Sequence, residues 1–204
     1  AAITLLGSHI AAQVSEDFSD GDFTANPTWS GHTELFQVNG DGWLQSQANT
    51  ASIAWLTTPS HAIGEGSWQI DVAILSAPTS ANYSAFYLAA DNDDLASCRA
   101  YYVKFGGQQQ NVSLCWQNGD QHTTLIASPA SLLTSTGLNR LTTRVVRTAD
   151  GTFSLAFRLH GQEDFTPIGS VTHSLLPTAE VCGLLVKCSA MRGHDFFFDN
   201  ININ

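Results

Sequence analysis

The sequence is poor in charge, and above all in positive charge. Charged residues make up 13 % of its 204 residues, about half of their usual share in globular proteins. Eight Lys and Arg stand against eighteen Asp and Glu, so the formal net charge is −10. Nucleic-acid and anionic-membrane binding both need clustered cations, so we expect neither partner. The acidity fits calcium, neutral glycans or protein partners, or it only keeps the chain soluble.

Long apolar runs are also missing. No segment approaches the ~20 apolar residues of a membrane helix, so we expect no membrane insertion. Residues 1–12 are apolar, end in small residues and lack a basic start. They resemble the back half of a secretory signal peptide cut near Ala12, or else form a first strand or a tail. On the first interpretation, residues 13–204 are a single secreted or cell-surface domain.

The four cysteines have no zinc-site spacing. Cys98 and Cys115 flank a possible hairpin and form the most suitable disulfide pair. Cys182 and Cys188 share one strand-like run and would lie roughly 20 Å apart, too far to bond to each other. Four buried thiols remain the alternative.

Strand patterns fill most of the chain. Residues 66–75, 84–88, 140–147 and 153–159 alternate polar with apolar side chains, and residues 181–186 are continuously apolar, as in a central strand. Asn118-Gly119 and Asp150-Gly151 are strong hairpin turns. About a dozen short strands at this spacing predict an all-β fold, a two-sheet antiparallel β-sandwich. Residues 128–137 are the one segment that favours a short helix or an irregular loop.

Two matched ends are the most informative feature. Near the start, an acidic turn leads to Trp29 and reads Asp17-Phe18-Ser19-Asp20-Gly21-Asp22-Phe23. Near the other end, an aromatic strand finishes in a carboxylate and an amide and reads Phe196-Phe197-Phe198-Asp199-Asn200. If the first and last strands meet, their oxygens could surround calcium, which takes about six to eight such ligands. The alternative is that these acids only form turns and cap backbone N–H groups. The candidate metal ligands are Asp17, Asp20, Asp22 and Asp199.

These ends carry a family resemblance. The opening block, followed by Pro27-Thr28-Trp29, resembles the start of an N-terminal module of secreted, surface-associated Bacteroidetes-type proteins. Residues 44–48, 101–107, 112–114 and 196–200 resemble further strands of that module. More remotely, both ends resemble concanavalin-like (LamG-type) jelly rolls, which include laminarin- and lichenin-cleaving hydrolases and sugar-binding modules. The resemblance implies a jelly roll with a concave face, a structural calcium ion and a larger parent protein.

Catalytic patterns are absent from the sequence. The hydrolases of this resemblance carry Glu-x-Asp-x-x-Glu on one strand, whereas residues 65–74 offer Asp71 with apolar residues where the second acid should stand. There is no Gly-x-Ser-x-Gly elbow, and the seven His residues form no metal-spaced pair. We therefore expect no enzyme, although a glycoside hydrolase or lyase with unrecognised acids remains an alternative.

Aromatic side chains are the remaining candidates, because flat rings beside polar groups bind sugars. Tyr101 and Tyr102 must point to opposite faces of one strand, and Trp116 lies beside the Asn118-Gly119 turn. Trp29 and Trp68 favour core packing. The predicted function is non-catalytic extracellular recognition or adhesion, with a glycan or another surface protein as partner, and a structural spacer is the alternative. The predicted ligand-binding residues are Trp116, Tyr101, Tyr102 and Tyr87.

Overall fold

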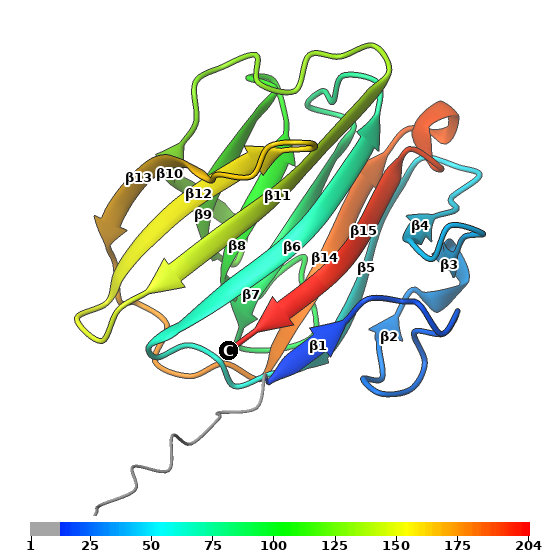
Figure 1. Ribbon diagram of the computed structural model, residues 1–204. Helices are drawn as coiled ribbons and strands as arrows, with labels where there is room; N and C mark the ends of the chain where they lie inside the picture. Colours follow the sequence, from blue (N-terminus) through cyan, green and yellow to red (C-terminus); the bar gives the residue numbers. More distant parts are fainter. Residues whose placement is uncertain (1–12) are drawn as a thin grey trace, which may run out of the picture.

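The alternating segments form two antiparallel sheets that pack face to face. The computed structural model describes residues 13–204, and Figure 1 shows the sheets one behind the other. The predicted signal-peptide remnant, residues 1–12, lies outside this range. The all-β sandwich expected from the strand patterns is confirmed. No helix in the described range is long and apolar enough to cross a membrane.

The two sheets contain fifteen strands. In order across the sheet, sheet A consists of β13 (Thr166–Thr172), β12 (Thr152–Leu159), β11 (Leu138–Arg147), β6 (Gly66–Leu75), β15 (Phe196–Ile203), β4 (Leu44–Ser46) and β3 (Phe36–Val38), with β1 (Val14–Glu16) paired to β15. Sheet B consists of β10 (Gln121–Ala127), β9 (Asn111–Asn118), β8 (Arg99–Gly106), β7 (Tyr83–Ala90), β14 (Val181–Cys188), β5 (Ser52–Pro59) and β2 (Ser30–Gly31). Two short 3₁₀ helices lie between strands: η1 (Thr33–Leu35) follows β2, and η2 (Ala190–Arg192) follows β14.

The predicted turns join neighbouring strands. Gly119 connects β9 to β10 and Gly151 connects β11 to β12, with φ of 61° and 83°. Glycine adopts this left-handed conformation without steric cost. The continuously apolar residues 181–186 lie in β14, which is central in sheet B. Residues 128–137 form an irregular connection between β10 and β11.

The core fills the space between the two sheets. Period-two alternation sends every second side chain inward, and Trp29 and Trp68 are each 1 % exposed there, as predicted. The largest other fully buried side chains are Tyr101, Phe18, Phe86, Phe105, Phe153, Phe196 and Phe198.

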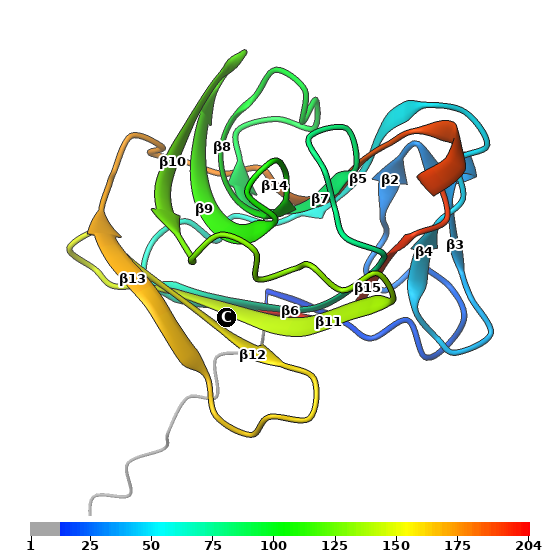
Figure 2. The same ribbon diagram turned by 90° about the horizontal axis from the view of Figure 1, so that it is seen from above.

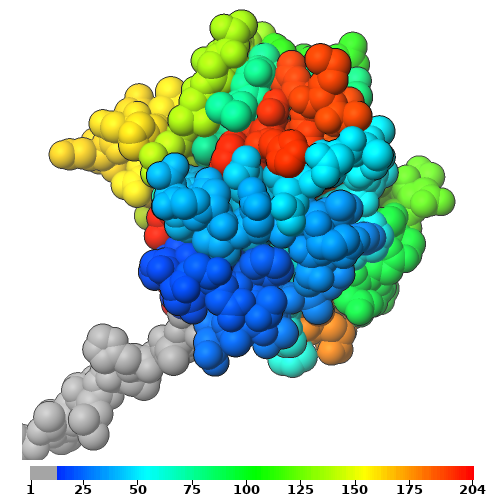
Figure 3. All heavy atoms as spheres, turned by 90° about the vertical axis from the view of Figure 1, so that its right-hand side faces the viewer, coloured from blue at the N-terminus to red at the C-terminus, as the bar shows by residue number. Residues whose placement is uncertain are grey.

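The first and last strands of the described range are neighbours, as the matched ends required. β1 pairs antiparallel with β15, with Val14 opposite Ile203 and Glu16 opposite Ile201. Figure 1 shows the blue strand beside the red one. Figure 3 shows the segment from β1 to β5 spread over the same edge of the sandwich. The two ends therefore close the fold.

The four cysteines are buried free thiols, so the predicted Cys98–Cys115 disulfide is wrong. Cys115 lies opposite Tyr102 in the β8–β9 register, whereas Cys98 precedes β8 and its carbonyl accepts a hydrogen bond from the Gly119 N–H. The two cysteines flank the hairpin but are offset by about four residues, roughly 13 Å of strand. Cys182 and Cys188 are not bonded to each other, as predicted.

Sheet B is curved, and Figure 2 shows its concave side turned away from sheet A. β10 and β9 rise at one side of this hollow, and the loop between β7 and β8 folds over it. The outer face of sheet B is therefore a sheltered surface. The outer face of sheet A is more open, apart from the projecting loop between β12 and β13.

The turn after β1 supplies a test of the closure. Phe18 is fully buried and its ring centroid lies 6.4 Å from that of Trp29. Phe18→Ala should lower the free energy of unfolding by about 3–5 kcal/mol, as for other buried phenylalanines. Phe23→Ala is the matched control, because Phe23 belongs to the same loop but is only partly buried. Equal losses in denaturant titrations would contradict the anchoring role of Phe18.

Candidate functional site

Tyrosines gather on the concave outer face of sheet B because neighbouring strands present them at alternate positions. Tyr83 and Tyr87 lie on β7 and Tyr102 on β8, and all three line one cavity. Tyr101, the preceding residue, points to the opposite face and is fully buried in the core. The prediction that Tyr101 and Tyr102 face opposite sides is confirmed.

Two of these tyrosines are stacked and held by hydrogen bonds. Tyr87 lies opposite Tyr102 in the strand register, and their ring centroids are 4.9 Å apart with 15° between the planes. The Tyr87 hydroxyl donates to Gln117 Oε1 at 2.8 Å, and the Tyr102 hydroxyl is hydrogen-bonded to His122 Nδ1 at 3.0 Å. Burial raises the pKa of both hydroxyls, so both stay protonated. Tyr87 is 3 % and Tyr102 6 % exposed, so the pair forms a fixed aromatic floor of which only a small part reaches the surface.

The loop from Asp91 to Cys98 covers one end of this floor. Leu95 is fully buried against the tyrosines, and the Trp55 indole N–H donates to the Asp93 carbonyl at 3.0 Å. A salt bridge of 2.8 Å joins Asp91 to Arg99 at the base of the loop. The loop is therefore tied at its base and along its length.

Two cavities lie on this face, the first beside the loop and the second at the opposite end of β8. The first, of about 280 Å³, lies over the tyrosines, and the second, also about 280 Å³, is bordered by the Gly106–Gln109 turn and β9. They share Tyr102, Lys104 and His122. Together they have the size of a small-ligand site. We name the first cavity the tyrosine groove and define it by Tyr83, Tyr87, Tyr102, Lys104, His122 and Leu185.

The polar groups of the groove are partly desolvated. Burial lowers the pKa of the Lys104 ammonium, which lies 4.3 Å from the Tyr83 ring centroid. Burial and the nearby Lys104 charge lower the pKa of His122. The imidazole is therefore neutral at neutral pH. If Nδ1 accepts the Tyr102 hydrogen bond, Nε2 carries the proton and is a hydrogen-bond donor.

The other two predicted ligand-binding residues lie on the inner face. Tyr101 is 0 % and Trp116 7 % exposed, and their ring centroids are 4.8 Å apart. The Tyr101 hydroxyl is hydrogen-bonded to His173 Nδ1 at 2.7 Å and accepts from the Leu175 N–H at 3.0 Å. The structure thus brings Tyr87 and Tyr102 together and places Tyr101 and Trp116 in the core.

Three of the four predicted metal ligands use their carboxylates locally. Asp17, Asp20 and Asp22 each accept a hydrogen bond from the backbone N–H two residues ahead. These are the turn contacts that the alternative interpretation of the acids predicts. Within residues 13–204, no three His, Cys, Asp or Glu side chains are grouped so that they could hold a metal ion.

The fourth predicted ligand, Asp199, belongs to a carboxylate pair that the sequence did not reveal. Asp199 on β15 lies directly opposite Asp71 on β6, so Asp71 does have a second acid beside it. A pattern within one strand cannot reveal this neighbour, because Asp199 lies on a strand 128 positions later in the sequence (199 − 71). Burial, followed by the charges of Asp71 and Asp17, raises the pKa of Asp199 to about 6.

The gap between these two carboxylates is filled. The Asn200 amide donates to Asp71 Oδ2 at 3.0 Å and to Asp199 Oδ2 at 3.1 Å. The Thr142 hydroxyl donates to Asp71 Oδ1. A hydrolytic pair needs space for the scissile bond between its acids, and here an amide group occupies that space. The pair is part of the architecture at the chain ends.

The residues that sequence reasoning missed are Lys104, His122 and Leu185. Lys104 could have been found, because it stands two residues after Tyr102 and so shares its face. His122 and Leu185 come from β10 and β14, and their places depend on the strand order. No local signal in the sequence gives that order.

The comparisons with known proteins give the fold. No family model and no curated protein matches the sequence. The VIP36 exoplasmic/lumenal domain in its Ca²⁺/Man-bound form has a TM-score of 0.64 and 9 % identity, covering 86 % of this chain and 81 % of that one. The Emp47p carbohydrate recognition domain has a TM-score of 0.64 and 10 % identity over 97 % of each chain. The carbohydrate-binding module CBM66 from Bacillus subtilis has a TM-score of 0.62 and 10 % identity, covering 86 % of this chain and 94 % of that one. The shared fold is the two-sheet jelly roll that the resemblance implied.

The raised pKa of Asp199 predicts that the free energy of unfolding falls as the pH rises. A carboxyl group whose pKa rises from 3.8 to about 6 on folding stabilises the fold below pH ~4 and loses that contribution as the pH passes ~6. The full change corresponds to ~3 kcal/mol, which solvent screening of this half-buried group reduces to about 1 kcal/mol. In the presence of a chelator, Asp199→Asn should raise the free energy of unfolding by that amount above pH ~7. A gain that persists at pH ~3 in urea titrations would refute this explanation.

Proposed function

We propose that residues 13–204 form a non-catalytic carbohydrate-binding module with a recognition or adhesion role, and that the tyrosine groove holds the glycan. The observation that carries this proposal is the cavity over the stacked Tyr87 and Tyr102 on the concave face. An apolar floor with a few fixed polar groups is the usual construction of a small-ligand site.

The chemistry of the groove suits a sugar. Aromatic rings pack against the apolar C–H faces of a pyranose, while its hydroxyls need hydrogen-bond partners at the rim. Lys104 and His122 provide donors beside the rings. Gln108, Gln109 and Asn111 line the adjoining cavity, and their amides can both donate and accept. The two cavities together could hold neighbouring units of one chain.

The similar structures support the same class of ligand. VIP36 was solved with mannose bound and also with Man3GlcNAc, and Emp47p and CBM66 are named as carbohydrate-binding domains. We infer a secreted or outer-surface setting and a larger parent protein, because the opening block resembles surface-associated bacterial modules. Another surface protein is the alternative partner, and a structural spacer is the alternative role.

A structural calcium ion is a further part of the proposal. VIP36 was also solved in Ca²⁺-bound forms, and the charge of Asp17 acts on Asp199 where the two chain ends meet. The four predicted acids fit a calcium site only in part, since Asp17, Asp20 and Asp22 are all engaged in turns. Any ion here would need backbone carbonyls as additional ligands.

Calcium binding can be measured through stability. An ion that binds only the folded chain should raise the melting temperature by about 5–10 °C at a hundredfold excess over its Kd. Asp17→Asn and Asp199→Asn should each remove the shift, and Asp150→Asn, at the β11–β12 turn, should leave it intact. Identical melting curves in calcium and in chelator would rule out a bound calcium ion. They would leave the proposed glycan binding in the tyrosine groove unaffected.

The groove itself is tested by glycan binding. A glycan array with the purified chain identifies a ligand, and Tyr83→Ala should then weaken its binding about tenfold, because an aromatic contact contributes ~0.5–1.5 kcal/mol beyond its buried area. Tyr102→Phe removes only the hydroxyl that is hydrogen-bonded to His122, so it should weaken binding less.

Met191→Ala is the control for this experiment. Met191 is 93 % exposed on η2, so its removal should change neither folding nor binding. If the unaltered protein binds no glycan on the array, the alternative role of a structural spacer is favoured. Release of reducing ends from a bound glycan would instead favour the hydrolase.

A further inference from the structure

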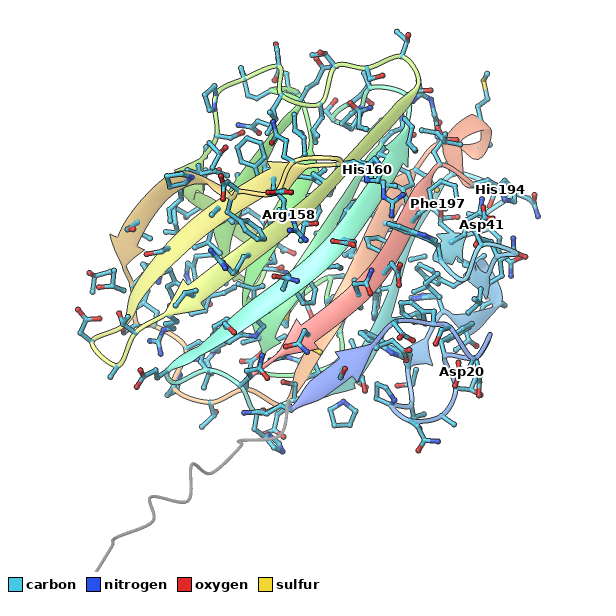
Figure 4. All side chains as sticks on the ribbon, in the orientation of Figure 1. Asp20, Asp41, Arg158, His160, His194 and Phe197 are labelled. Carbon is cyan, nitrogen blue, oxygen red and sulfur yellow. The ribbon has the colours of Figure 1, made fainter. Side chains whose placement is uncertain are left out.

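Three of the eight cationic side chains lie together on the outer face of sheet A. Arg140 and Arg144 stand four residues apart on one face of β11, and Arg158 stands on the adjacent β12. Figure 4 shows Arg158 and His160 on the face of sheet A that is turned toward the viewer. A chain with a net charge of −10 thus carries a local cluster of positive charge.

The strand register fixes this cluster. Thr142 lies opposite Arg158 and Arg144 opposite Ala156, and the His160 N–H donates to the Arg140 carbonyl at 3.0 Å. Arg158 is therefore the diagonal neighbour of both other arginines, at ~7–8 Å between backbones. Like charges at this spacing repel each other.

No acid of the described chain neutralises the three arginines by a salt bridge. The salt bridges between residues 13 and 204 involve Arg99 and Arg192. Aromatic rings hold the cluster instead: the Arg140 guanidinium lies 4.6 Å from the Trp43 ring centroid, and those of Arg144 and Arg158 lie 4.2 and 5.0 Å from that of Phe165. Stacking uses the face of a guanidinium and leaves the N–H groups at its edge available to an anion. One of these groups, Arg158 Nη1, also donates to the Glu163 carbonyl at 3.5 Å.

A cavity of about 190 Å³ lies between Arg140 and Arg158. Thr142 contributes to it from the sheet, and His160 and Gln162 come from the start of the loop between β12 and β13. Figures 2 and 3 show this loop standing out from sheet A. The cavity is smaller than the ~300–1,000 Å³ of drug-sized sites, so it suits a single small ring or group.

Besides the two arginines, the cavity is lined by Asp71 and Gln162, whose polar groups suit the hydroxyls of a ligand. Asp71 lines the cavity, and its carboxylate already accepts from Thr142 and Asn200. Gln162 Oε1 accepts from the Leu159 N–H at 3.1 Å, which leaves the amide N–H groups of Gln162 free. Among the residues that line the cavity, the two arginines outnumber the single carboxylate of Asp71.

We propose that this cavity binds an acidic sugar, with the ring carboxylate held between Arg140 and Arg158 and the hydroxyls directed to Asp71 and Gln162. Planar guanidinium groups match a carboxylate through paired N–H donors. The site lies on the opposite sheet from the tyrosine groove and does not depend on the groove binding a glycan.

The test is titration of the protein with galacturonate and glucuronate, with galactose and glucose as neutral counterparts, followed by calorimetry and NMR shifts. At least one uronate should bind, and its neutral counterpart should bind at least tenfold more weakly. Arg140→Gln and Arg158→Gln should each weaken uronate binding about tenfold or more, because each removes a charge-assisted contact. Tyr83→Ala should leave it unchanged.

Arg144→Gln is the matched control. It removes the same charge from the same Phe165 ring, but Arg144 does not line the cavity, so affinity should change less than about threefold at physiological salt. Thermal melting of each variant shows whether it remains folded. Absence of uronate binding, an equal loss with Arg144→Gln, or equally tight binding of inorganic sulfate would overturn the proposal.

Discussion

The strand pairing of β15 is the constraint on which the rest of the structure depends. This strand pairs with β1, β6 and β4, so it joins the first strand of the described range to the middle of sheet A. Because the hydrogen-bond register fixes which side chains face inward, one slip of β15 would turn Phe196 and Phe198 out of the core. The same register sets Asp199 beside Asp71 and allows Asn200 to donate to both carboxylates.

The two proposed sites arise from the faces that the core does not use. On sheet B the curvature and the Asp91–Cys98 loop shelter apolar rings, so the outer face becomes a second, smaller hydrophobic cluster. Sheet A is not sheltered in this way, and its outer face keeps long charged side chains whose stems and guanidinium groups rest on rings such as Trp43 and Phe165. One sandwich therefore offers an aromatic surface on one side and a cationic surface on the other.

Much of the fold could be predicted from local patterns, whereas most of the site could not. Alternation located β6, β11 and β12, the Gly119 and Gly151 turns located two hairpins, and the matched ends predicted the pairing of β1 with β15. The same alternation showed that Tyr101 and Tyr102 diverge, although not which of them faces the core. The partners of Tyr102 and Asp71 come from strands distant in sequence, and a net charge summed over the chain conceals the grouping of three arginines.

The unbonded cysteines separate the stability of this fold from the redox state of its surroundings. Burial raises the pKa of Cys98 and Cys182 to about 12, so almost none of either thiol is present as the reactive thiolate at neutral pH. Residues 13–204 contain no disulfide bond that glutathione could reduce, and their four thiols are buried and unpaired. The sandwich should therefore mature by strand pairing alone, without disulfide exchange, and should keep its shape when it passes from a reducing to an oxidising medium.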